Sequence, residues 1–167
     1  MTEEFQKYAK DLLELLGKDE PVELLGQSVD EVRELTERAL TEVLTKSMGP
    51  GEWSAHQVLQ HLADTEMVYG VRIRMIVTQE RPSIVGYDQD AWGSRFKDLD
   101  ESGQQTFLRW RVLREANLRL LGSLTNDEWS RVGNHSERGE ESIRSMVALL
   151  AGHDRAHLDQ IKRALSR

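Results

Sequence analysis

Two histidines near the C-terminal end of this chain have the spacing of a metal-binding pair. His153 and His157 lie four positions apart in the segment GHDRAHLDQI, so a helix would place both imidazole rings on one face, about one turn apart. Two imidazoles at that spacing can bind the same divalent ion. They also stand where apolar residues are due on the core-facing stripe of the segment, which includes Ile143, Met146, Val147, Leu150 and Ile161. The pattern therefore predicts a metal site that faces the protein interior.

A third histidine, His61, occupies a similar position in an earlier segment. It stands beside Leu62 on an apolar stripe that continues through Thr65 and Tyr69, so it should face inward or nearly so. Three imidazoles from two helices leave coordination positions open, whereas structural zinc sites usually have four protein ligands. We therefore predict that His61, His153 and His157 hold one divalent ion in an open site. The alternative is a set of hydrogen-bonded core histidines, but three buried imidazoles without partners would be costly.

Carboxylates are the next candidates for chemistry. Asp64 and Glu66 follow His61 on the same predicted helix, and Asp90 lies in a later connecting stretch. Each could be a fourth ligand, an acceptor for a ligand N–H or a general base. We predict catalytic roles for Glu66 and Asp90, and a solvent-facing position for Asp64.

Three further residues near these candidates need an interpretation. Gln160 follows His157 by three positions and is expected to hydrogen-bond a ligand imidazole or a metal-bound water. His56 lies near the start of its helix, off the main stripe, and is predicted to be at the surface. His135 is predicted to be a solvated loop residue, with a position at the mouth of the metal site as the alternative.

Helices must position these residues. Helical periodicity predicts helices over 3–16, 28–40, 54–78, 103–123 and 141–165, a short helical turn over 21–26 and a short helix near 90–96. Ser28 with Glu31 has the spacing of a capping box, and Ser54 is expected to cap the helix after it. No segment alternates with period two for long enough to predict a strand.

The connections between these helices favour one topology. Most are short, but the stretch 79–102 is long enough to travel the length of a bundle. The next helix would then start from the same end as the previous one. The sequence therefore predicts an all-α four-helix bundle with up-down-down-up topology and one long crossover, forming a single domain over residues 1–167.

Composition excludes several functions. The net charge is −7, which disfavours binding to nucleic acid because an acidic surface repels phosphates. No run of 18 or more apolar residues is present, so no membrane span is expected. The N-terminal segment reads as a helix and not as a signal peptide, and a cytoplasmic location is the default expectation. The chain has no cysteine, so any thiol in its chemistry must come from a second substrate.

Larger motifs resemble a known family. The segments GEWSAHQVLQHLADTE at 51–66 and GHDRAHLDQI at 152–161 are similar to the two metal-binding helices of the DinB-like (YfiT-like) metalloprotein superfamily. ERPSIVGYDQDAW at 80–92 resembles the crossover of that family, and NHSERGEESIRSMVALLAGHDRAH at 134–157 its approach to the last helix. The likeness spans most of the chain, although the first 27 residues carry little of it.

This resemblance implies a four-helix bundle of up-down-down-up topology, often a homodimer. It implies that His61 matches the first family ligand, and His153 and His157 the second and third. Members bind zinc, nickel, iron or related divalent ions, and some use the ion to activate a low-molecular-weight thiol for S-transfer.

Three functions remain open at this point. The first is a metal-dependent transferase that activates a low-molecular-weight thiol, with Arg72, Arg74 or Arg95 meeting a carboxylate of the cofactor unless these arginines lie at the surface. The second is a metal-dependent hydrolase with Glu66 or Asp90 as base. The third is a non-enzymatic metal-binding stress-response protein. Either enzyme would act on a small-molecule substrate.

Spare apolar residues predict self-association. The first helix carries a broad apolar face of Tyr8, Leu12, Leu13, Leu15 and Leu16, and a later helix adds Phe107 and Trp110. A bundle core needs only a stripe from each helix, and two-fold dimers are the commonest oligomers. We therefore predict a homodimer. The alternative is that the first helix covers the bundle and buries its leucines within the monomer.

Overall fold

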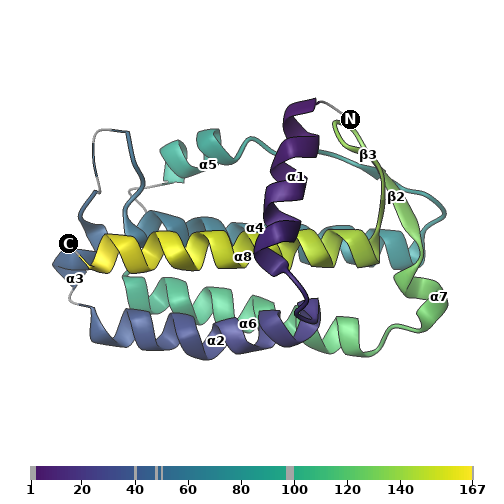
Figure 1. Cartoon of the computed structure of the whole chain (residues 1–167). Coiled ribbons are helices and arrows are strands. Elements are labelled where there is room, and N and C mark those ends of the chain that lie inside the picture. The colour runs from purple at the N-terminus through teal and green to yellow at the C-terminus, as the bar shows by residue number, and fades with distance from the viewer. Residues whose placement is uncertain (1–2, 40, 48, 50, 97–99, 167) are drawn as a thin grey trace.

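Four long helices form the body of the protein. The computed structural model describes residues 3–39, 41–47, 49, 51–96 and 100–166. The bundle consists of α2 (Pro21–Arg38), α4 (Ala55–Thr78), α6 (Gly103–Gly122) and α8 (Ile143–Leu165). Helices α2 and α8 run in one direction, and α4 and α6 run in the other (Figure 1). The predicted all-α bundle with up-down-down-up topology is therefore confirmed.

Helix starts follow local capping chemistry. Ser54 accepts a hydrogen bond from the backbone N–H of Gln57, and the Gln57 side chain accepts one from the backbone of Ser54. This reciprocal pair confirms the predicted cap of α4. The predicted helix start at Ser28 is wrong, because α2 already begins at Pro21 and runs through this position. Proline suits the first position of a helix, where its missing N–H costs nothing, and Ser28 Oγ instead donates to the Leu25 carbonyl at 2.8 Å.

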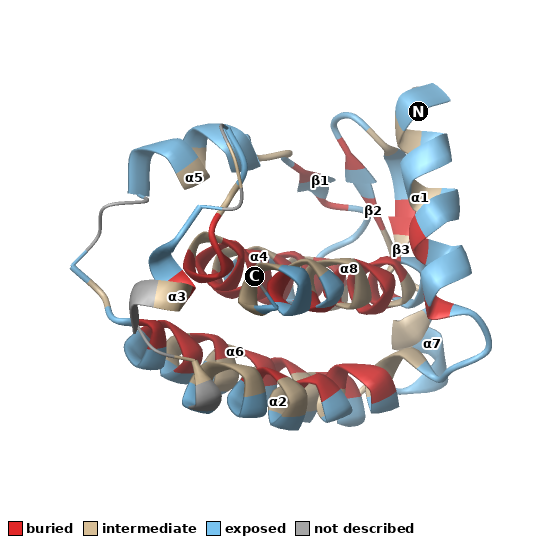
Figure 2. Ribbon diagram, turned by 60° about the vertical axis from the view of Figure 1, so that its left-hand side comes forward, coloured by how far each residue is buried: buried red, intermediate tan, exposed pale blue. Residues whose placement is uncertain are grey.

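The protein is built from three stacked layers. The α2–α6 layer lies on one side of the α4–α8 layer, and a cover of smaller elements lies on the other side (Figure 2). The cover contains α1 (Glu3–Leu16), which crosses α8, and α5 (Gln89–Phe96), whose position agrees with the short helix predicted near 90–96. The small helices α3 (Thr41–Thr45) and α7 (Asn126–Trp129) lie in connections.

A small sheet completes the cover. It contains β1 (Ser83–Ile84), β2 (Val132–His135) and β3 (Gly139–Ser142) in the order β1-β2-β3. Strand β1 pairs parallel to β2 with Ile84 opposite His135, and β2 pairs antiparallel to β3. The expectation that the chain has no strand is therefore wrong, because strands of two to four residues are too short to carry a period-two signal.

The apolar core is divided into two clusters. One includes Tyr69, Ile73, Ile143 and Ala151, and the other includes Ala63 and a set formed by Val58, Leu62, Trp110, Leu158 and Ile161. Both α4 and α8 contribute to each cluster, so each helix has a middle segment that belongs to neither, over 64–68 and 152–157. Buried polar residues fill this gap. No helix in the described part of the chain combines the length and the apolar character that a membrane crossing requires.

Candidate metal centre

The three predicted ligands meet where the polar middle segment of α8 faces α4. His61 comes from α4, and His153 and His157 come from α8. One ring nitrogen of each lies within 4.8 Å of those of the other two, and the Nε2 atoms of His61 and His153 are 3.0 Å apart. Two nitrogens bound to one zinc ion at about 2.0–2.1 Å are roughly 3 Å apart. The spacing of this pair therefore suits a shared ion.

The protonation and orientation of the His157 ring also suit metal binding. Nδ1 of His157 lies 2.9 Å from Oε1 of Gln160. Because an amide oxygen only accepts, Nδ1 carries the proton and Nε2 keeps a lone pair for an ion. The predicted hydrogen bond of Gln160 to the His157 imidazole is therefore present, and the role of that imidazole as a metal ligand stays a prediction.

Burial keeps the three rings neutral. Desolvation, together with the nearby His157, lowers the pKa of His61 to about 3. Burial, assisted by the neighbouring histidines and Arg114, places the pKa of His153 well below its ordinary value. Burial also lowers the pKa of His157. Neutral imidazole is the form that binds metal, so the donor set fits a divalent ion.

The cluster leaves room for other ligands. Among the residues that the structure describes, no carboxylate joins the three histidines, and the chain has no cysteine. The Trp53 ring packs against His61 with the ring centroids 5.2 Å apart. Three protein ligands with open positions are typical of catalytic sites and not of closed structural ones.

Glu66 lies in a separate buried network. Its side chain is 1% exposed, its Oε1 accepts from Arg114 Nε at 2.9 Å, and its Oε2 accepts from Asn117 Nδ2 at 2.8 Å. Arg114 Nη1 also donates to Asp154 Oδ2 at 2.7 Å and to Ser28 Oγ at 2.8 Å. These contacts connect all four bundle helices. Because both oxygens of Glu66 already have partners, this geometry gives its predicted catalytic role no support, and we propose a positioning role instead.

Asp90 lies at an open cleft instead. It is exposed on α5 and lines a cleft of about 480 Å³ together with Trp53, His157 and Gln160. A carboxylate at the mouth of a cleft that contains a predicted metal ligand can exchange protons with a bound molecule. Its catalytic role stays a prediction.

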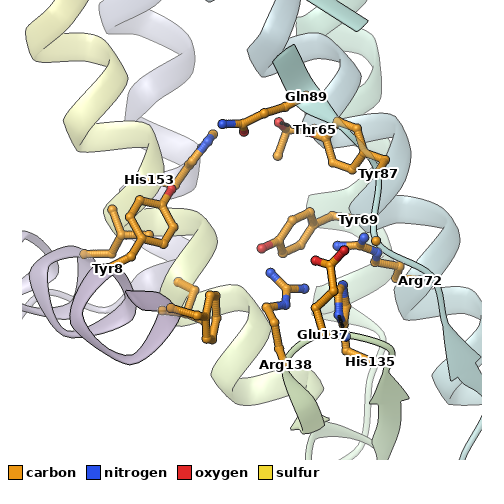
Figure 3. A pocket seen from close by; sticks show the side chains of 14 residues that line it. Tyr8, Thr65, Tyr69, Arg72, Tyr87, Gln89, His135, Glu137, Arg138 and His153 are labelled. Atoms are coloured by element: carbon orange, nitrogen blue, oxygen red, sulfur yellow. Dashed lines mark hydrogen bonds between the residues drawn. The ribbon is translucent and has the colours of Figure 1, made fainter. Parts of the chain in front are cut away.

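A second cavity reaches the cluster from another side. It has a volume of about 130 Å³, lies between α1, α4, α8 and the sheet, and is lined by His153 (Figure 3). His135 lines it as well and is buried on β2, so its predicted solvated position is wrong and the alternative near the site is correct. Burial, with the charges of Arg138 and Arg72, lowers the pKa of His135 to about 4.

The sequence did not predict several residues that lie around the histidine cluster and its cavity. Arg138 lines the cavity beside His153, but the prediction of a loop without strands gave no reason to place it there. Gln89 lines both the cavity and the open cleft. His56 is buried and not at the surface as predicted, because its Nε2 lies 2.9 Å from Thr106 Oγ1 of α6.

Asp64 and the three arginines considered for a carboxylate also have definite positions. Asp64 is only partly exposed and pairs with Arg109 at 3.1 Å, so it does not point freely into solvent. Arg72 is buried at the cavity, whereas Arg74 and Arg95 are exposed. Of these three arginines, Arg72 is the one that lines a cavity together with His153.

Comparisons with known proteins find a family model and relatives that are provisionally named metal-dependent hydrolases. A family model described as the DinB superfamily matches residues 24–161. A protein of Oceanobacillus iheyensis, provisionally named metal-dependent hydrolase OB0413, is 29% identical over 142 residues, which cover 85% of this chain and 78% of the relative. A second protein of the same organism, OB0782, also provisionally named a metal-dependent hydrolase, is 30% identical over 120 residues. The match covers 72% of this chain and 69% of that relative. YfiT of Bacillus subtilis, also provisionally named a metal-dependent hydrolase, is 28% identical over 160 residues, which cover 89% of this chain and 85% of YfiT.

A solved structure is also similar. YfiT from Bacillus subtilis, described as a probable metal-dependent hydrolase with an unusual four-helix bundle topology, superposes with a TM-score of 0.77. The match covers 87% of this chain and 86% of YfiT at 22% sequence identity. At that identity the likeness establishes the fold.

Proposed function

This chain belongs to the DinB superfamily, and we propose that it is a metal-dependent enzyme acting on a small molecule, with His61, His153 and His157 as the ligands of one divalent ion. The observation that carries the proposal is the meeting of three ring nitrogens within 4.8 Å, with no fourth ligand among the described residues. An ion held there would lower the pKa of a bound water or thiol and so supply a nucleophile near neutral pH. Zinc, nickel and iron all suit imidazole ligands.

Hydrolysis is the first candidate reaction. The exposed carboxylate of Asp90 shares a cleft with His157 and can accept a proton there as a general base. The names of the relatives as metal-dependent hydrolases agree with this reaction. In this scheme Gln160 holds the His157 ring in place through Nδ1.

Transfer of a low-molecular-weight thiol is the second candidate. The cleft beside His157 has a volume of about 480 Å³, which lies within the range of pockets that hold small ligands. The absence of cysteine means that no thiol of the protein competes for the ion. A purely structural metal would be expected to have a fourth protein ligand, so this cluster gives the non-enzymatic alternative less support.

Metal analysis followed by a substrate screen tests the proposal. The purified protein is loaded with zinc, nickel or iron, dialysed, and analysed for bound metal. It is then assayed on ester, amide and electrophilic substrates, with and without low-molecular-weight thiols. Turnover without a thiol that disappears on chelation indicates a hydrolase, and turnover that needs a thiol indicates a transferase. Failure to retain any of these ions would overturn the proposed metal centre.

A further inference from the structure

The cavity beside His153 is built from charged and aromatic groups. Besides His153 on α8 and His135 on β2, its walls include Tyr8 on α1, Tyr69 and Arg72 on α4, Tyr87 in the crossover and Arg138 at the turn after β2. Figure 3 shows that the hydroxyl of Tyr69 and the side chains of Arg138 and His153 face the same space. A molecule in this cavity would touch both the arginine side chains and His153, one of the proposed metal ligands.

Arg72 is the unusual group in these walls. It is 5% exposed, and its Nη2 donates to the backbone carbonyl of Val85 at 2.8 Å. Its guanidinium also lies 5.7 Å from the ring centroid of Tyr69 and 6.0 Å from that of Tyr87. Within the described ranges of the chain, no carboxylate forms an ion pair with it. A buried cation without a counter-charge is destabilising, because no ion pair compensates for its loss of hydration, so an anion in the cavity would offset this cost.

Of the two arginines at the cavity, Arg138 has an ion-pair partner, whereas Arg72 has none within the described residues. Arg138 is paired with the buried carboxylate of Glu141 at 2.9 Å. Glu137 lines the cavity but is exposed on the turn after β2, where solvent weakens its interaction with the arginines. Burial, with the charges of Arg138 and Arg72, lowers the pKa of His135 at the cavity to about 4. Because His135 is then neutral, it does not add a second charge.

The size and donors of the cavity select the type of anion. One unmatched guanidinium suits a monoanion better than a phosphate dianion, and its planar fork matches the two oxygens of a carboxylate. Burial raises the pKa of Tyr69 and of Tyr87, so both phenols stay protonated and can donate hydrogen bonds. A volume of about 130 Å³ admits a small group and not a bulky ligand.

We propose that this cavity is the substrate-recognition pocket of the metal centre, and that it binds the carboxylate of a small organic acid through Arg72. The inference rests on the proposed function, because it makes the cavity the place where the substrate of that centre is held. It assigns Arg72 to specificity, with Tyr69 as an additional donor. Glu137 opposes the bound anion from the rim.

Binding of propionate, compared with the neutral isostere propionamide, tests the pocket. Ligand-observed NMR titrations are made on the zinc-loaded protein and on metal-free protein, so that binding to the ion is separated from binding to Arg72. We expect wild type to bind propionate at least about tenfold more tightly than propionamide in both forms, because a charged hydrogen-bonded pair contributes about 1.5–3 kcal/mol. Inorganic phosphate should bind no more tightly than propionate to the metal-free protein.

Substitutions locate the site. Arg72→Gln should weaken propionate binding to the metal-free protein at least about tenfold, and Arg72→Lys should retain part of it. Arg74→Gln is the matched control, since Arg74 is exposed on the same helix and should leave binding unchanged. Glu137→Gln should strengthen binding by up to about fivefold, the range of one exposed charge interaction. Circular dichroism of each variant verifies folding.

The outcomes separate this inference from the proposed function. If Arg72→Gln binds propionate as wild type does and still retains zinc, the carboxylate pocket is overturned and the metal centre stands. If zinc is not retained but propionate binding depends on Arg72, the metal centre is overturned and the carboxylate site stands. Should Arg72→Gln fail to fold, equal binding of propionate and propionamide by metal-free wild type overturns the pocket without any variant.

Discussion

A Cβ atom built on Gly152 would lie 2.1 Å from the carbonyl oxygen of Leu12. Real Cβ atoms do not approach backbone oxygens so closely, so α1 can rest on α8 only because residue 152 has no side chain. The contact lies one position before His153, at the polar layer between the two core clusters. The position of α1 over the substrate cavity therefore depends on this glycine.

Gly152→Ala should displace α1. The added methyl group cannot be accommodated by a small side-chain movement, because the nearest atoms belong to the Leu12 backbone. We expect a loss of stability of about 1–3 kcal/mol, typical of overpacking, and faster amide exchange in α1, measured by urea denaturation and hydrogen exchange. Gly26→Ala is the control, since a Cβ there meets nothing within 4 Å and should stabilise α2 by up to about 1 kcal/mol. Unchanged exchange in α1 of Gly152→Ala would contradict the proposed contact.

The three histidines should bind metal as one unit. His157→Ala removes a ring whose other nitrogen is already fixed by Gln160. The bound metal after dialysis should fall at least about tenfold. Loss of a residue that only hydrogen-bonds a metal ligand already weakens metal binding by about this factor. Mass spectrometry of metal content measures this. Asp159→Asn, an exposed change two residues along the same helix, should leave the metal content unchanged. Full metal occupancy in His157→Ala would exclude it as a ligand.

Metal removal should weaken the fold without unfolding it. The two apolar clusters pack on either side of the histidines and do not include them, unlike a zinc finger, whose core depends on its ion. Chelation should therefore lower the melting temperature and leave a helical circular dichroism spectrum. A coil spectrum of the metal-free protein at room temperature would show that the ion is required for folding.

The bundle and the meeting of the three histidines could be predicted because helical periodicity indicates which face of each helix is buried. His61, His153 and His157 interrupt apolar stripes, and the structure brings them together. The surrounding pocket could not be predicted, since it is assembled by strands of two to four residues, which are too short for a periodic signal. The sequence consequently favours a solvated loop for His135, with the mouth of the site only as the alternative, and gives no reason to place Arg138 near the site.

Glu66 illustrates a different limit of the sequence. A carboxylate five residues after a ligand on the same helix is a reasonable catalytic candidate, but sequence does not reveal that Arg114 and Asn117 occupy its oxygens. These two residues lie 48 and 51 positions after Glu66, on α6. Only the packing of α4 against α6 decides between a catalytic and a positioning role.

A stability measurement distinguishes these roles of Glu66. Glu66→Ala leaves the buried guanidinium of Arg114 with one carboxylate fewer, and removal of one partner from a buried pair costs about 3–5 kcal/mol. We expect a loss of this size in urea denaturation. Glu115→Ala, which removes an exposed partner of Arg111, should cost less than about 1 kcal/mol. A Glu66→Ala protein of wild-type stability would indicate that the network is not structural.

The homodimer prediction now rests on α1 alone. Phe107 and Trp110 are 5% and 0% exposed within the monomer, so they are not spare surface as the sequence suggested. Leu12 and Leu16 are buried as well, which agrees in part with the alternative that α1 covers the bundle. Tyr8 and Leu15 remain 47% and 41% exposed and lie seven positions apart, on one face of the helix.

Light scattering at micromolar concentration tests self-association through this face. We expect a mass of about twice 19.2 kDa, because two-fold dimers bury the same patch on both copies. Leu15→Glu would place two like charges near the dimer axis and should shift the mass to that of the monomer. Val112→Glu, at a position 58% exposed on α6, should leave the dimer intact. A monomeric mass for the wild-type protein would overturn the prediction, and a dimer that persists in Leu15→Glu would move the interface away from α1.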